Sequence, residues 1–193
     1  HTRYISVTGV QTCALPICLP DALARKFDEA VFHGPVPGSG FDTLSDVQEL
    51  DLPAEPTFAD LADIDAAIAA NNGVLNGWAL SPKARGLVNR SVDGSGRPLF
   101  DYNGGALLNA PVALSRAVYD NADGDGDEVI GFAGDWTQAF YGTVEGITVK
   151  MSEHATVGGV NLFERNMFAV LAEVEVGFAV RDKSKFVKIV AGV

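Results

Sequence analysis

The pattern of apolar and polar positions changes partway along the chain. Apolar residues recur at helical spacing over Asp21–His33 and Phe58–Asn71, whereas they alternate with other residues over Glu173–Val180. The alternating run is the clearest strand signal in the sequence. Helices therefore come early and strands late, which predicts an α+β fold.

The two early helices have predictable ends. We expect the first to end at Gly34 and Pro35, because glycine readily adopts the left-handed cap conformation and proline cannot continue a helix. The second has Thr57 as its predicted N-cap, and Asp60 suits its first turn. Its predicted buried stripe consists of Phe58, Leu61, Ile64 and Ile68.

Shorter elements follow the second helix. Val74–Leu80 is predicted to be a buried strand, and Ser81 followed by Pro82 predicts a third helix, anchored by Leu87 and Val88. The later predicted strands are Ala110–Val118, Val129–Phe132, a run around Ile147–Met151, and Phe186–Val190, with an acidic turn over Asp120–Glu128.

Residues 1–17 have two interpretations. One is a genuine N-terminal strand, because Ile5–Val10 has strand character. The other, which we favour, is a segment to be set aside before fold reasoning. The run Val7–Ile17 back-translates codon by codon into a common short-read sequencing adapter, and His1–Arg3 fits the adapter stretch beyond a variable index. We therefore expect residues 1–18 to be an adapter-derived artefact, poorly packed or attached to a sheet edge, that cuts the first helix short.

Charge and cysteine content exclude several classes of function. The 193 residues carry a net charge of −11, which argues against sequence-independent binding to nucleic acid or to an anionic membrane surface, because both need clustered Lys and Arg. Cys13 and Cys18 lie in or beside the adapter-like segment, so we expect neither a disulfide framework nor thiolate chemistry. No apolar run approaches the ~20 residues that span a bilayer.

The run Asp123-Gly-Asp125-Gly-Asp127 is the most conspicuous chemical motif, since alternating carboxylates can surround calcium. A helix-flanked calcium loop needs Gly at its sixth position and Glu at its twelfth, and neither Asp123 nor Asn121 as first position provides both. Asp and Gly are also the residues that tight turns select. We therefore favour a solvated hairpin turn and keep Asp123, Asp125 and Asp127 as candidate calcium ligands.

Other candidate sites have simpler structural explanations. Gly34–Gly40 lacks the Lys-Ser/Thr pair of a phosphate-binding loop. His33 and His154 lack the Cys or spaced carboxylate partners of a zinc site or a catalytic triad, and His33 suits the last turn of its helix because of the helix dipole. Trp78 and Trp136 adjoin strand patterns and are expected in the core or in an interface. We therefore expect no cofactor and no enzymatic site.

Four stretches, in order, resemble the major capsid protein of tailed phages, of the Hong Kong 97 type. The end of the family's spine helix is similar to ALARKFDEAVFHGPVPG, and its strand, Pro-started helix and Asp-x-x-Gly-Arg turn are similar to GWALSPKARGLVNRSVDGSGRPLF. The strand that passes between the family's two domains is similar to GFAGDWTQAFYGTVEGITVKMSEHAT. Its C-terminal strand and return are similar to NLFERNMFAVLAEVEVGFAVRDKSKFVKIV. Their order and spacing match over nearly all of Leu19–Val193.

The resemblance implies two domains. An axial domain near the capsomer centre would consist of residues 40–138 and 182–193, and a peripheral domain at its edge would consist of residues 19–39 and 139–181. The spine helix would be cut short, and the family's N-terminal arm and extended loop would lie upstream of this sequence.

The resemblance also implies a structural protein and not an enzyme. Its copies would assemble as pentamers and hexamers into the icosahedral head shell that encloses phage DNA. Its partners would be other copies of itself, with scaffold, protease and portal proteins during assembly in the bacterial host cytoplasm, and we expect neither sequence-specific nucleic-acid binding nor membrane contact. Two alternatives remain open: a shell protein of a bacterial nanocompartment (encapsulin-like), which has the same fold, and a calcium-dependent or hydrolytic enzyme built around Asp123–Asp135.

Some members of the family join subunits by an isopeptide bond between a Lys on the extended loop and an Asn in the C-terminal strand, assisted by a Glu. The stretch FERNMFAVLAE places Asn166 and Glu173 at those two positions. A Glu in an apolar environment, with a raised pKa, would accept the proton of the attacking Lys. The alternative, which we favour, is that Asn166 is a polar strand-end residue and Glu173 a solvated strand residue.

Overall fold

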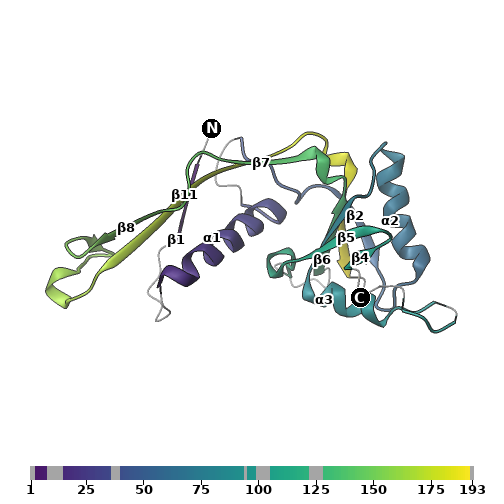
Figure 1. Ribbon diagram of the computed structural model, residues 1–193, viewed down its shortest axis with the longest axis horizontal. Helices are drawn as coiled ribbons and strands as arrows, with labels where there is room; N and C mark the ends of the chain where they lie inside the picture. The colour runs from purple at the N-terminus through teal and green to yellow at the C-terminus, as the bar shows by residue number, and fades with distance from the viewer. Residues whose placement is uncertain are drawn as a thin grey trace.

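The computed structural model describes residues 3–7, 15–35, 40–93, 95–98, 105–121 and 128–191, with the side chains of residues 3–7, 15–18 and 160 excepted. Figure 1 shows an elongated molecule, in which an arm of β-strands projects from a part built around a larger sheet, and helix α1 runs alongside the arm. The described residues form α-helices in the first half and most strands in the second, so the predicted α+β class is confirmed.

Helix α1 (Leu15–Phe32) begins earlier than the predicted start at Asp21, and it has Pro20 inside it. The prediction was wrong at this end because the helical stripe was traced only from Leu23 onward, whereas the backbone is already helical within the adapter-like segment. The other end is confirmed, since Gly34 has a φ of 75°, in the left-handed region that favours glycine. The buried residues of α1 are Leu23, Ala30, Val31 and Phe32.

Helix α2 (Phe58–Ala70) has the predicted N-cap. The Thr57 hydroxyl accepts a hydrogen bond from the amide of Asp60 at 3.4 Å, and the Asp60 carboxylate accepts one from the amide of Thr57 at 2.7 Å. Leu61, Ile64 and Ile68 are buried as predicted, but Phe58 is 58% exposed. Phe58 occupies the first helical position, one turn ahead of the first buried residue, and is therefore an exception to the predicted stripe.

Strand β3 (Gly77–Leu80) is buried along its whole length. The predicted start at Val74 is wrong, because residues 73–76 are irregular between the turn after α2 and the strand, and the Val74 side chain is 69% exposed. Helix α3 (Pro82–Arg90) begins as predicted, with the Ser81 hydroxyl accepting a hydrogen bond from the amide of Ala84 at 3.2 Å. Val88 is buried in α3, whereas the other predicted anchor, Leu87, is half-buried.

A six-stranded mixed sheet forms the larger part of the molecule, with the strand order β2–β12–β6–β3–β5–β4. The further strands are β2 (Gln48–Leu52), β12 (Phe186–Ala191), β6 (Glu128–Gly134), β5 (Ala110–Leu114) and β4 (Ala106–Leu107). β2 and β12 pair in parallel, as do β3 and β5. The predicted strand Ala110–Val118 is too long: it ends at Leu114, because Ser115 caps the 3-10 helix η1 (Arg116–Val118) by accepting a hydrogen bond from the Ala117 amide.

The arm, which we call the β-arm (residues 139–180), is built on a second, antiparallel sheet. Its long strand β11 (Ala169–Val180) pairs with β7 (Ala139–Thr143) and with β8 (Thr148–Ser152). The short strands β9 (Thr156–Val157) and β10 (Val160–Asn161) pair with each other. Strand β1 (Arg3–Val7) pairs with β11 at the edge of this sheet. An edge attachment is one of the two placements expected for residues 1–18, and a strand at this position also agrees with the strand character of the sequence.

Two hydrophobic cores lie on opposite faces of the six-stranded sheet, because successive strand residues point to opposite sides. Helices α2 and α3 cover one face, where their apolar residues pack around Trp78 and Ile189. Helix α1 covers the other face, with the rings of Phe32 and Phe132 stacked 4.9 Å apart. This second core continues into the β-arm, since the α1 residue Phe27 also contacts Phe178 of β11. Helix α1 therefore joins the β-arm to the sheet.

Candidate assembly surface

The β-arm exposes more large apolar side chains than the rest of the described chain. Ten of the fifteen large apolar side chains that are exposed among the described residues lie between Phe140 and Phe168. They are Phe140, Tyr141, Val144, Ile147, Val149, Met151, Val157, Phe163, Met167 and Phe168. All residues of β8 are exposed as well. Apolar side chains gathered in this way mark a surface that another molecule covers.

Two glycines face each other near the base of the β-arm. Gly142 of β7 pairs with Gly177 of β11, and a Cβ added to either would have no described atom within 4 Å. Neither glycine has a positive φ, so the backbone conformation does not require glycine there. Directly paired residues of antiparallel strands point to the same face, so the two positions leave a bare site, which we call the glycine notch. Phe140 lies on the same face and is 55% exposed.

A polar network holds the point where the chain leaves the sheet for the β-arm. Asp135 follows β6 and is 7% exposed, and one oxygen of its carboxylate accepts hydrogen bonds from the Thr137 hydroxyl at 2.6 Å and from Asn76 Nδ2 at 2.9 Å. The hydrogen bond from Thr137, more than that from Asn76, holds the pKa of Asp135 below its usual value of 3.8. The Trp136 amide in turn donates to Asn76 Oδ1 at 2.8 Å. The network thereby fixes the position at which the β-arm begins.

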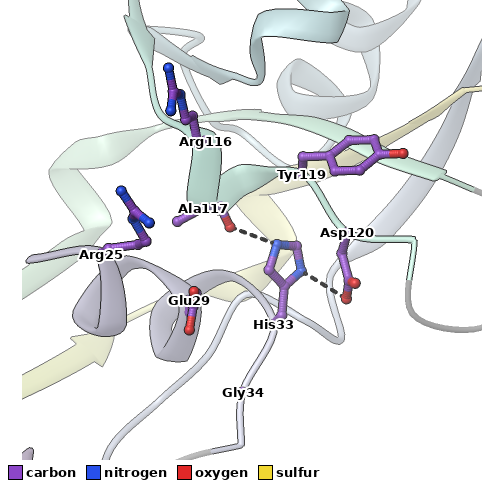
Figure 2. Close-up of a pocket in the computed structure, with 8 residues that line it drawn as sticks. All are labelled: Arg25, Glu29, His33, Gly34, Arg116, Ala117, Tyr119 and Asp120. Atoms are coloured by element: carbon purple, nitrogen blue, oxygen red, sulfur yellow. Dashed lines mark hydrogen bonds and ion pairs between the residues drawn. The ribbon is translucent and has the colours of Figure 1, made fainter. Parts of the chain in front are cut away.

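A pocket of about 390 Å³ lies where α1 ends against the sheet (Figure 2). The His33 ring crosses it from α1 to η1, with Nε2 3.0 Å from the carbonyl oxygen of Ala117 and Nδ1 3.7 Å from the carboxylate of Asp120. Carbonyl oxygens only accept hydrogen bonds, so Nε2 carries a hydrogen. His33 directly follows α1, and its amide still donates to the Glu29 carbonyl at 2.9 Å. Its ring joins α1 to η1, and the predicted interaction with the helix dipole stays a prediction. Arg25 and Arg116 also line this pocket.

The comparisons with known proteins give the family of this chain. The sequence pattern described as "Phage capsid family" matches residues 19–191. The chain belongs to this family. The probable major capsid protein gp17 of Mycobacterium phage L5 is 30% identical over 87% of this chain, and that of Mycobacterium phage D29 is 26% identical over 86%. The chain spans 58% of the length of both relatives.

Chains of solved structures share the fold. A chain from Gordonia phage Cozz, 22% identical, superposes with a TM-score of 0.77 and is matched over 100% of this chain and 70% of its own length. A chain described as the capsid of an empty GTA particle computed with C5 symmetry, 14% identical, has a TM-score of 0.65, with 100% and 74% covered. These likenesses confirm the predicted α+β fold of the Hong Kong 97 type. The family match favours a phage capsid subunit over the nanocompartment and enzyme alternatives.

The two cross-link candidates suggested by the phage capsid family both lie on the β-arm. Asn166 is exposed and follows the 3-10 helix η3 (Phe163–Arg165) in the left-handed conformation, with a φ of 51°. Glu173 lies within β11, and its side chain is 25% exposed. Its carboxylate is 3.0 Å from Lys150 Nζ, so its neighbour is a cation of the same β-arm. A role of either residue in a cross-link stays a prediction.

The other candidate residues of this capsid-family chain take structural positions or lie outside the described part. Asp123, Asp125 and Asp127, the calcium candidates, lie outside the described residues. No group of three or more His, Cys, Asp and Glu within the described ranges is arranged to hold a metal ion. His154 contacts Phe163 on the β-arm, with ring centroids 5.5 Å apart. In the part of the chain that is described, no helix is long and apolar enough to cross a membrane.

Both tryptophans lie in or against the core, as predicted. Trp78 is 1% exposed, and its Nε1 donates to the carbonyl of Leu107 at 2.9 Å. Trp136 is partly buried, and its Nε1 donates to the carbonyl of Gly77 at 2.9 Å. These hydrogen bonds satisfy the polar atom of each indole while the ring packs against apolar neighbours.

Sequence reasoning missed the glycine notch and the Asp135 network. A signal for the notch exists, since Gly177 interrupts the apolar alternation of its strand with a residue that weakens strands. No local signal pairs it with Gly142. Asp135 and Thr137 have the spacing of a side chain that caps its own turn, but their hydrogen bonding with Asn76 depends on the tertiary fold.

Proposed function

We propose that this chain is the shell-forming part of a phage major capsid protein, whose copies assemble as pentamers and hexamers into the icosahedral head that encloses the phage DNA. The observation that carries the proposal is the β-arm, on which ten large apolar side chains are exposed. In a closed shell, repeated contacts between identical copies cover such surfaces. Membership of the phage capsid family over residues 19–191 supports the same function.

Within this subunit, residues 40–138 and 182–193 form the axial domain, and residues 19–39 and 139–181 form the peripheral domain. Two observations support this division. The six-stranded sheet and the sheet of the β-arm share no strand in the described chain, and the chain passes from one to the other at the start of β7 and again after β11. The outgoing and returning segments are joined there, because the Arg181 amide donates to the Gln138 carbonyl at 2.8 Å. Helix α1 is the spine helix that packs on both sheets.

The proposed subunit acts without catalysis. Its partners are further copies of itself and, during assembly in the bacterial host cytoplasm, scaffold, protease and portal proteins; in its final state it resides in the virion. The net charge of −11 supports a wall that does not adhere to packaged DNA, because adhesion requires Lys and Arg to displace the counterions of the phosphates.

The proposal is tested on the full-length subunit that contains this chain, with closed shells detected by sedimentation and electron microscopy. Tyr141 and Met151 are 78% and 68% exposed, so neither side chain contributes to the core of its own subunit. Replacing both by Asp should abolish shells and leave the thermal unfolding temperature of the subunit unchanged, because charged groups cannot be buried unpaired between copies.

The matched control is Phe178→Ala on the same β-arm. Phe178 is 7% exposed, so this variant should destabilise the subunit itself, by about 3–5 kcal/mol. The pair of variants separates assembly from folding. Shells formed at the wild-type yield by the Tyr141→Asp, Met151→Asp variant would contradict the proposal.

A further inference from the structure

Acidic and basic residues are segregated around the six-stranded sheet. Residues 42–65 contain eight Asp and Glu and no Lys or Arg, whereas residues 83–97 contain four Lys and Arg and one Asp. The first segment includes β2 and α2, and the second includes α3 and the turn that follows it. We call residues 42–74, which contain β2 and α2, the acidic edge, and residues 82–97, which contain α3, the basic edge.

The sheet topology places the two edges apart. Strand β2 is one end of the sheet, and α2 packs on its neighbour β12 and on β6. Helix α3 packs on β3 and β6, toward the other end. Both helices cover the same face, since residues of both belong to one core. Along the strand order, the acidic segment therefore lies toward the β2 end of the sheet and the basic segment toward the β4 end.

Several charged side chains on both edges have no ion-pair partner among the described residues. Asp51, Glu55, Asp63 and Asp65 are exposed and form no ion pair with another described residue. On the basic edge, the exposed Arg90 and Arg97 likewise form none within the described ranges, whereas Lys83 pairs with Glu128. Like charges that are gathered without partners repel one another, so neither edge is explained by the stability of the single subunit.

Apolar side chains accompany the charges on both edges. Phe58 begins α2 and Val74 follows its end, and these side chains are 58% and 69% exposed; Val92, beside the end of α3, is 54% exposed. The exposure of Phe58 breaks the apolar stripe of its own helix. On each edge, an apolar side chain thus lies among charged ones, which is the composition of a contact surface with an apolar centre and a polar rim.

The middle of α3 carries a glycine that its own subunit does not need. Gly86 lies on the exposed side of the helix, and a Cβ added there would have no described atom within 4 Å. Within a helix glycine is less favourable than alanine by about 1 kcal/mol. Glycine at such a position permits another backbone to approach closely, and in this subunit no described segment does so.

We infer that the acidic edge of one copy docks against the basic edge of the next copy around the capsomer ring. This inference rests on the proposed function and names the contact that orders the ring. Two different edges of one molecule make a heterologous contact, which generates a closed ring when the rotation closes. Two acidic or two basic edges repel each other, so only the head-to-tail order brings opposite charges together. The apolar residues supply buried area, and the charges select orientation and register.

Charge reversal in the full-length subunit tests the docking. Asp63→Lys with Asp65→Lys adds positive charge to the acidic edge, so that like charges meet, and Arg90→Glu with Arg97→Glu does the converse on the basic edge. Each double variant should lower the yield of shells about tenfold or more at ~0.1 M salt, measured by sedimentation and electron microscopy. The variant that carries all four reversals should recover shells, because its edges are again opposite in charge.

Two controls keep the result interpretable. Thermal unfolding of each variant should match the wild type, because all four side chains are exposed. Asp63→Asn with Asp65→Asn removes charge at constant size and should give a yield between the wild type and the reversal. A wild-type yield from either double variant, or no recovery in the fourfold variant, overturns the docking and leaves the proposed function standing. Absence of shells from the wild-type subunit would instead contradict the proposed function.

Discussion

Replacing Gly177 by valine should separate the folding of the subunit from its assembly. Gly177 lies within β11 opposite Gly142, without a positive φ, and a Cβ there meets no described atom within 4 Å. Valine therefore clashes with none of the residues that the structure describes. Glycine inside a strand costs about 0.5–1 kcal/mol relative to alanine, and β-branched residues suit strands. We expect the free energy of unfolding to rise by about 1 kcal/mol and the unfolding temperature by about 2–4 °C.

The same substitution fills the glycine notch. If another copy occupies the notch in the shell, the added side chain overpacks that contact at a cost of about 1–3 kcal/mol. Each contact would then weaken by about tenfold or more. Scanning calorimetry of this chain measures the gain in stability, and the shell yield of the full-length protein measures the loss in assembly. Gly177→Ala is the graded control, with a smaller group and a smaller loss of shells.

Two outcomes would refute this reasoning. A valine variant that is more stable and still assembles at the wild-type yield would mean that no copy occupies the notch in the shell. A variant that unfolds at a lower temperature would mean that other atoms of the same subunit already occupy the space around Gly177.

Three further predictions concern single side chains. The folded pKa of Asp135 lies below its usual 3.8, so its contribution to stability is present above about pH 4 and is lost as the pH falls through the lower folded value. Urea unfolding from neutral to acid pH should show this loss. Asp135→Asn should make the free energy of unfolding depend less on pH over the same range. Thr57→Ala removes the capping box of α2 and should lower the free energy of unfolding by about 1 kcal/mol in urea, whereas no change would mean that the cap is not formed. In mature full-length shells boiled in detergent, we expect electrophoresis to show monomers, with Asn166 and Glu173 structural; ladders of joined subunits that Asn166→Asp or Glu173→Ala removes would instead establish the cross-link.

The sequence by itself determined the elements whose signals are local. The cap at Thr57 and the helix start at Ser81 and Pro82 depend on residues within one turn of each other, and both are confirmed. The alternation over Glu173–Val180 likewise lies inside β11. Element ends were predicted less well: β3 starts at Gly77 and not at Val74, and β5 ends at Leu114 and not at Val118. Apolar residues continue past each of these ends, so the pattern alone does not mark them.

Tertiary structure decided which distant residues meet, and with them the candidate surfaces. The pairing of Gly142 with Gly177, the reach of His33 to Ala117 and the hydrogen bond between Asn76 and Asp135 all join segments far apart in the sequence. The acidic and basic segments are visible in the sequence, but only the strand order places them toward different ends of one sheet. The physical reason is that strand order and register minimise the free energy of the whole packed sheet, which no single segment specifies.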